Sequence, residues 1–154
     1  ALPVAELAAP HAVLFLWATV PRLDDAIDLM RAWGFDYRSH VVWRKTYPSG
    51  ALHRGTGRWL VNVHELLLLG VRGDMPAPLP GTQELSEIAA PVGRHSEKPA
   101  VFRQLIERYF PDVGRIELFA RETAPGWAAW GNEVAPGAPN RTRPADNSAA
   151  GAEP

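Results

Sequence analysis

AVLFLWATVPRLDDAIDLMRAWG, residues 12–34, places a continuous apolar run directly before an amphipathic segment. The run from Ala12 to Trp17 predicts a buried strand covered on both faces, as in the parallel part of an α/β sheet. Apolar residues then recur every three or four positions from Leu23 to Trp33, which predicts a helix. Pro21 near the start of this segment and Gly34 just past its end are typical helix boundaries. A strand followed by a helix indicates a βαβ unit and a layered α/β fold.

Further regular elements are predicted along the chain. They are strands within Ser39–Trp43, Leu60–Val71 and Arg115–Ala120, and a helix that has Pro99 in its first turn and carries Phe102, Leu105, Ile106, Tyr109 and Phe110 on one face. Residues 47–57 and 76–81 are rich in glycine and proline, so each predicts a surface loop, the first of them polar. Because an α/β sheet gathers loops at the ends of its strands, we expect binding residues to follow strands.

Composition excludes several classes of protein. The 154 residues, 16.9 kDa, suit a single core, and the net charge of -1 gives no extended basic field for nucleic acid. The chain has no cysteine, which excludes disulfides, thiolate nucleophiles and zinc sites that need sulfur. Apolar runs fall short of a membrane span, and the chain shows no export signal, so we expect a cytoplasmic protein. The small, polar and proline-rich residues 135–154 predict a disordered tail after a domain over 1–134.

Common catalytic motifs are missing. His64-Glu65 begins like a metalloprotease motif, but leucines follow and the second histidine is absent, so no metal site is expected. The chain has no phosphate-binding loop, dinucleotide fingerprint or nucleophile elbow. Arg72-Gly73-Asp74 spells an adhesion tripeptide, but its position after a strand predicts a turn.

Two polar clusters remain, each with an ordinary structural alternative. Arg94-His95-Ser96-Glu97-Lys98-Pro99 precedes the second helix, where backbone N–H groups and Lys98 can hold an anion such as a carboxylate. The alternative is a solvated helix start capped by Ser96. The second cluster joins Glu117 and Arg121 to Trp127 and the segment 130–133, a combination of acid, amide and aromatic groups that can hold a nucleoside. The alternative is a surface salt bridge beside core tryptophans.

An ordered set of short segments resembles a known family. The segments are Leu14-Phe15-Leu16-Trp17, Ala32-Trp33-Gly34-Phe35, Trp43-Arg44-Lys45-Thr46, Gly57-Arg58-Trp59-Leu60, His64-Glu65-Leu66-Leu67, His95-Ser96-Glu97-Lys98-Pro99, Ile116-Glu117-Leu118-Phe119-Ala120-Arg121, and Gly126-Trp127 with Trp130-Gly131-Asn132-Glu133. Together they resemble the adenine N6-methyltransferases related to the catalytic subunit of the eukaryotic messenger-RNA adenosine methyltransferase, in particular the shorter bacterial and phage members. The resemblance covers residues 1–134 in order.

This resemblance implies a Rossmann-like fold, S-adenosylmethionine as methyl donor, and the exocyclic amine of adenine in DNA or RNA as acceptor. The implied cofactor-binding residues are Lys98, Glu117, Arg121, Asn132 and Glu133. Lys98 would face either the methionine carboxylate of the cofactor or the target base. The implied substrate-binding residues are Trp17 and Glu65 near the target adenine, with Arg54 and Arg58 on the nucleic-acid backbone, where guanidinium groups suit phosphate.

One motif of the family is missing. Family members carry an Asp-Pro-Pro-Trp sequence that accepts hydrogen bonds from the adenine amine, and these 154 residues contain none. We therefore expect an N-terminally truncated fragment, incomplete in its fold and inactive or very weak by itself, because the amine would not be aligned with the methyl group. A non-catalytic subunit that binds nucleic acid or a catalytic partner is the alternative function. A generic α/β domain without a cofactor is the third.

Overall fold

The computed structural model describes residues 2–134, and the tail predicted for 135–154 lies outside the described residues. The chain divides into two compact units, Ala1–Tyr109 and Phe110–Pro154. Composition predicts a single core, whereas the contacts divide the chain into these two units. Composition counts apolar residues and does not show how contacts group them.

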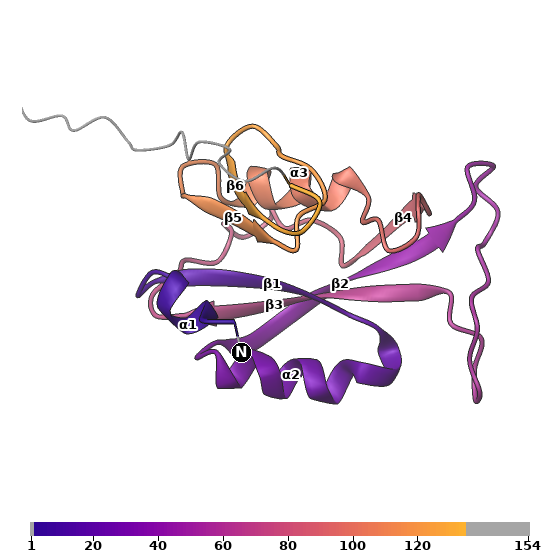
Figure 1. The fold of residues 1–154 in the computed structure, drawn as a ribbon, viewed down its shortest axis with the longest axis horizontal. Helices are drawn as coiled ribbons and strands as arrows, with labels where there is room; N and C mark the ends of the chain where they lie inside the picture. Colours follow the sequence, from indigo (N-terminus) through magenta and orange to yellow (C-terminus); the bar gives the residue numbers. More distant parts are fainter. Residues whose placement is uncertain (1, 135–154) are drawn as a thin grey trace, which may run out of the picture. The chain divides into compact units, whose positions relative to one another are not determined.

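The first unit is built on a mixed four-stranded sheet (Figure 1). Its strands are β1 (Ala12–Ala18), β2 (Asp36–Thr46), β3 (His64–Arg72) and β4 (Glu87–Pro91), and its helices are α1 (Val4–Leu7), η1 (Val20–Arg22), α2 (Leu23–Ala32) and α3 (Ala100–Tyr109). The strand order is β1-β3-β2-β4. Strand β3 runs antiparallel to both of its neighbours, and β4 runs parallel to β2. The α/β class is therefore confirmed.

The first strand differs from its predicted environment. Strand β1 pairs antiparallel with β3 and forms an edge of the sheet, and most of its side chains are only half-buried. The expected parallel strand covered on both faces is wrong, because a continuous apolar run does not distinguish the two kinds of pairing. Since β1 and β2 both run antiparallel to β3, they are parallel to each other, and α2 connects them. The βαβ connection is present, with β3 inserted between its two strands.

Helix α2 follows the predicted boundaries closely. Asp24 and Asp25 lie in its first turn and Arg31 in its last, which matches the helix dipole. Gly34 has a φ of 83°, and its N–H donates to the carbonyl of Arg31 at 2.9 Å. A side chain at Gly34 would be strained by this left-handed backbone, so the glycine ends the helix as predicted.

The two helices of ten residues cover opposite faces of the sheet (Figure 1). On one face Gly70 of β3 approaches the fully buried Met30 of α2 so closely that a Cβ at Gly70 would lie 2.5 Å from the Met30 sulfur. On the other face Leu67 of β3 packs with Trp43 of β2 and Phe102 of α3. Because strand side chains alternate between faces, Glu65 shares the face of Leu67. Glu65, the site residue predicted in β3, therefore faces α3.

The second unit contains a small parallel sheet. Strands β5 (Arg115–Leu118) and β6 (Trp127–Trp130) pair in register, and beyond them the N–H of Ala120 donates to the carbonyl of Trp130 at 2.9 Å. The predicted strand 115–120 is confirmed but ends two residues early. Phe119 interrupts it with a φ of 61°, a left-handed backbone that is rare for an aromatic residue.

Candidate functional site

The site in the first unit is centred on one acidic side chain in an otherwise apolar strand. Glu65 lies in β3 directly opposite Trp43 of β2, and only 7% of the residue is exposed. An ionised carboxylate at such a position loses its hydration. The penalty for one buried ion is roughly several kcal/mol unless charged partners replace the water. The strand therefore requires nearby cations.

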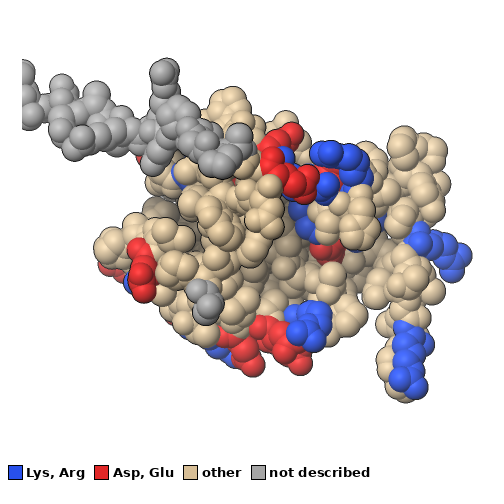
Figure 2. All heavy atoms as spheres, in the orientation of Figure 1, with Lys and Arg blue, Asp and Glu red and all other residues tan. Residues whose placement is uncertain are grey.

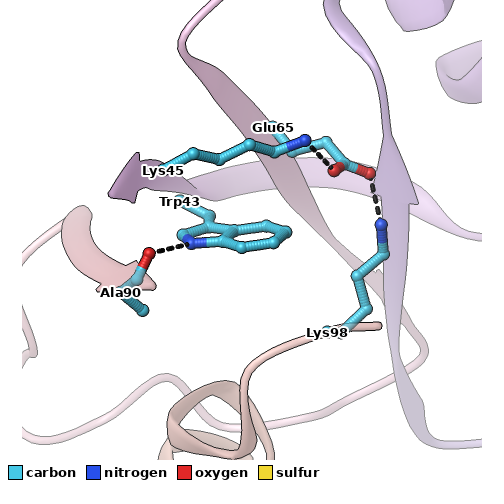
Figure 3. Close-up of polar contacts among 5 residues, drawn as sticks. All are labelled: Trp43, Lys45, Glu65, Ala90 and Lys98. Atoms are coloured by element: carbon cyan, nitrogen blue, oxygen red, sulfur yellow. Dashed lines mark hydrogen bonds and ion pairs between the residues drawn. The ribbon is translucent and has the colours of Figure 1, made fainter. Parts of the chain in front are cut away.

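Two lysines supply those cations. The Lys45 ammonium lies 2.8 Å from Oε2 of Glu65, and the Lys98 ammonium lies 2.5 Å from Oε1 (Figure 3). Lys45 is in β2, and Lys98 is in the irregular segment just before α3. Two ammonium groups share one carboxylate, so the cluster has a net charge of +1 and attracts an anion or a hydrogen-bond acceptor.

The two lysines also control the ionisation of Glu65. Burial by itself raises the pKa of Glu65, but hydrogen bonds from Lys45 and Lys98 and the charges of both lysines outweigh it. The pKa of Glu65 is therefore held below its ordinary value of 4.5. At neutral pH Glu65 is a carboxylate and acts only as a hydrogen-bond acceptor.

Aromatic side chains form one wall of this site. The indole N–H of Trp43 donates to the carbonyl of Ala90 at 2.9 Å, which fixes the ring in place (Figure 3). Trp17 meets Trp43 edge-on with ring centres 5.9 Å apart, and meets Phe102 in the same way at 4.9 Å. The Lys98 ammonium lies 5.0 Å from the centre of the Trp17 ring, within cation–π range. Trp43 is buried, so the half-buried Trp17 is the ring of this pair that a ligand can reach.

The segment before α3 differs from the predicted helix start capped by Ser96. Helix α3 begins at Ala100, and Ser96 lies outside it with a φ of 64°, so Ser96 is not its N-cap. Glu97 accepts hydrogen bonds from the backbone N–H of Arg94 at 2.7 Å and from its side chain at 3.4 Å. Lys98 instead turns to Glu65 of β3.

The connection between β2 and β3 projects away from the sheet (Figure 1). It carries Arg54 and Arg58, and residues 47–63 contain no aspartate or glutamate. Figure 2 shows basic side chains on this projection. Beyond the predicted loop 47–57, Trp59 is 93% exposed and Leu60 81% exposed. The strand predicted from Leu60 begins only at His64, so Leu60 belongs to the connection. Within residues 2–134 neither arginine forms a hydrogen bond or an ion pair with the Glu65 cluster.

In the second unit, Arg121 and Glu133 form an ion pair with Nε and Oε1 3.0 Å apart. Glu117 lies in β5 opposite Ala129, and Asn132 is exposed beside Glu133. Trp130 is 48% exposed, so it is not the core residue of the structural alternative. The predicted salt bridge of that alternative is present.

A glycine positions the end of this segment. A Cβ at Gly131 would lie 2.2 Å from the backbone oxygen of Ala120, a distance that no side chain tolerates. Gly131 therefore lets the backbone leading to Asn132 approach the backbone before Arg121.

The structure brings together three of the predicted site residues, Trp17, Glu65 and Lys98, although they come from three separate segments. Sequence reasoning did not single out Lys45 and Trp43 as site residues. The predicted strand ended at Trp43, but β2 continues to Thr46, so Trp43 and Lys45, two residues apart, lie on the face of Glu65. The alternation of strand side chains, extended past Trp43, is the signal that could have found them. The left-handed backbone of Phe119 was not predicted either, because no local sequence pattern indicates it.

In residues 2–134, histidine, aspartate and glutamate side chains form no group of three suited to a metal ion. In the same part of the chain, every helix is too short or too polar to cross a membrane.

Comparisons with known proteins agree with the resemblance. The sequence profile of the MT-A70 family matches residues 1–133. The chain is 33% identical over 134 residues to the Type II methyltransferase M.MunI of Mycoplasma sp, covering 86% of this chain and 55% of that protein. It is 32% identical over 125 residues to the human N(6)-adenosine-methyltransferase catalytic subunit METTL3, covering 79% of this chain and 21% of that subunit. The chain thus spans about half the length of the first relative and a fifth of the second, and it belongs to the MT-A70 family.

Proposed function

We propose that the protein transfers a methyl group from S-adenosylmethionine to the N6 amine of an adenine in DNA or RNA, on a Rossmann-like fold. The observation that carries this proposal is the meeting of Lys98, Glu65 and Trp17 in one cluster. These are the residues of the first unit that the resemblance implies for the methionine carboxylate and the target adenine. Membership of the MT-A70 family and relatives named as adenine methyltransferases support the same activity.

The residues of the cluster suit a planar base with donor and acceptor groups on its edge. The Glu65 carboxylate can accept a hydrogen bond from an exocyclic amine, and the Lys98 ammonium can donate to a ring nitrogen or to a carboxylate. The accessible face of Trp17 can stack on a base. A target base in a duplex would reach this cluster only after it is flipped out of the stack.

The residues of the second unit suit an adenosyl group. The carboxylates of Glu117 and Glu133 can accept hydrogen bonds from ribose hydroxyls, and Asn132 can both donate to and accept from a purine edge. Asn132 and Glu133 are exposed, so a ligand can reach them. When bound, S-adenosylmethionine supplies an activated methyl group, and the role of the protein is to bind and orient the two reactants.

Arg54 and Arg58 suit the phosphate backbone. Both lie on the projecting connection between β2 and β3, where the side chains are exposed and no acidic residue competes with phosphate. Guanidinium groups bind phosphate through two parallel hydrogen bonds. We assign them to orienting the nucleic acid rather than to reading its sequence.

Calorimetry with S-adenosylhomocysteine tests the cofactor part of this proposal. We expect the chain to bind it, and Lys98→Met and Arg121→Ala each to weaken binding about tenfold, the loss of a charge-assisted contact. Arg31→Ala is the matched control, because Arg31 is an exposed arginine that pairs only locally with Asp28. Absence of binding by the wild-type chain would refute the cofactor site and favour the non-catalytic alternative.

A single-turnover assay with labelled cofactor and an adenine-containing oligonucleotide tests the chemistry. By itself the 154-residue chain is expected to transfer the methyl group very weakly or not at all, because it lacks the Asp-Pro-Pro-Trp acceptor. Rapid transfer by these residues alone would show that another group aligns the amine.

A further inference from the structure

We propose that Lys45 is a positioning residue, the permanent counter-ion of Glu65, whose presence leaves Lys98 free to exchange Glu65 for a ligand. This inference rests on the proposed function, which assigns Lys98 to a carboxylate or a base. It assigns a role to Lys45, a residue for which the sequence predicts none.

The two lysines are carried by different kinds of backbone. Lys45 lies inside β2, where its N–H donates to the carbonyl of Val63 at 2.9 Å and its carbonyl accepts from the N–H of His53 at 2.9 Å. Strand β4 pairs with the other side of β2 at this position. Lys98 belongs to an irregular segment between β4 and α3. Lys45 is thus the fixed partner of Glu65, and Lys98 is the partner whose backbone can adjust.

The Lys45 ammonium is also held over a fixed aromatic ring. Its ammonium lies 4.9 Å from the centre of the Trp43 ring, and Trp43 is 2% exposed and hydrogen-bonded to Ala90. A cation over a desolvated tryptophan is stabilised by the ring. The Lys98 ammonium lies farther from the same ring, at 5.8 Å, and its nearer ring is the half-buried Trp17 of the edge strand β1. The Lys45 ammonium therefore has the two closest fixed partners in the sheet, the carboxylate of Glu65 and the Trp43 ring.

The charge balance around Glu65 depends on both lysines. With both lysines present, Lys98 can leave Glu65 and the carboxylate still has one counter-ion. Without Lys45, departure of Lys98 would leave a buried carboxylate without a counter-ion, which is strongly unfavourable. Lys98 would then be held by Glu65 and less available to a ligand.

Competitive labelling of lysine amines with an acylating reagent, followed by mass spectrometry, measures how tightly Lys98 is held. We expect Lys98 in Lys45→Met to react roughly fivefold more slowly than in the wild type, because removal of one cation strengthens its remaining ion pair. Lys45→Arg keeps the charge and should restore the wild-type rate. Arg44→Met is the matched control, because it removes a cation from the same strand but one that pairs with Glu87.

A second variant protects the test against misfolding of Lys45→Met. Glu65→Gln removes the charge that competes for Lys98, so Lys98 should react faster than in the wild type. Unchanged labelling of Lys98 in Glu65→Gln, or in a folded Lys45→Met, would overturn the inference.

Binding of S-adenosylhomocysteine separates this inference from the proposed function. Lys45→Met should bind it roughly fivefold more weakly than the wild type, in step with the labelling, and Lys45→Arg should restore binding. If the wild type binds and Lys45→Met binds equally well, the inference about Lys45 is wrong and the proposed function stands. If the wild type does not bind, the proposed cofactor site is wrong, and the labelling alone decides whether Lys45 controls Lys98.

Discussion

The Lys98 ammonium and the Glu65 carboxylate are 2.5 Å apart in space and 33 residues apart in the chain. This contact joins the segment before α3 to the middle of the sheet in the first unit. It also places Lys98 over the Trp17 ring of a third segment. The cluster consequently depends on the packing of the whole first unit rather than on any local motif.

The stability of the protein should depend on pH through Glu65. The pKa of Glu65 is lower in the folded chain than its ordinary value, so its stabilising contribution is fully present above about pH 4.5 and is lost as the pH falls through the folded pKa. We expect the free energy of unfolding to fall less steeply between about pH 5 and pH 3 in Glu65→Gln than in the wild type. Urea denaturation at several pH values measures this. Glu6→Gln, at an exposed position of α1, should keep the wild-type slope.

Trp43→Phe should destabilise the first unit by about 1–3 kcal/mol. The substitution removes the hydrogen bond to the carbonyl of Ala90, leaves that buried acceptor unpaired and opens space in the core. Urea denaturation followed by circular dichroism gives the free energy of unfolding. Trp59→Phe is the control: Trp59 is 93% exposed, so its substitution should change stability by less than about 0.5 kcal/mol. Equal effects at the two positions would contradict the packing of Trp43.

Gly131→Ala should disrupt the end of the second unit. The added methyl group would collide with the backbone of Ala120, which cannot move away as a flexible side chain would. We expect faster amide hydrogen exchange in β5 and β6, and weaker binding of S-adenosylhomocysteine if Asn132 and Glu133 contact it. Gly114→Ala is the control in the same unit, because its Cβ meets no atom within 4 Å and its φ is ordinary. Wild-type exchange in Gly131→Ala would refute the close approach.

The double variant Arg54→Ala/Arg58→Ala should bind an adenine-containing oligonucleotide more weakly and with less dependence on salt. Each phosphate contact that is lost should lower the slope of log affinity against log salt by about 1. Fluorescence anisotropy at several salt concentrations measures this slope. The control is Arg22→Ala/Arg31→Ala, two exposed arginines that pair with Asp25 and Asp28. If both double variants keep the wild-type slope, Arg54 and Arg58 do not contact phosphate.

Strand β4 shows where reasoning from the sequence failed. Residues Glu87–Pro91 form only a short strand that ends in a proline, and nothing in their local pattern predicts it. The strand exists because it pairs with β2, more than 40 residues earlier in the chain. The direction of β1 was missed for the same reason, since its pairing with β3 depends on residues about 50 positions away.

The sequence by itself determined the helices α2 and α3 and the presence of β1, β2, β3 and β5, because a helical period, a strand run and their end signals are local properties of the chain. The family resemblance added the roles expected of Glu65 and Lys98. Only the tertiary structure decided the strand order, the faces covered by the two helices, and the sharing of Glu65 by Lys45 and Lys98. Those features arise from contacts between distant segments, where burial of one carboxylate requires cations that no neighbouring residue supplies.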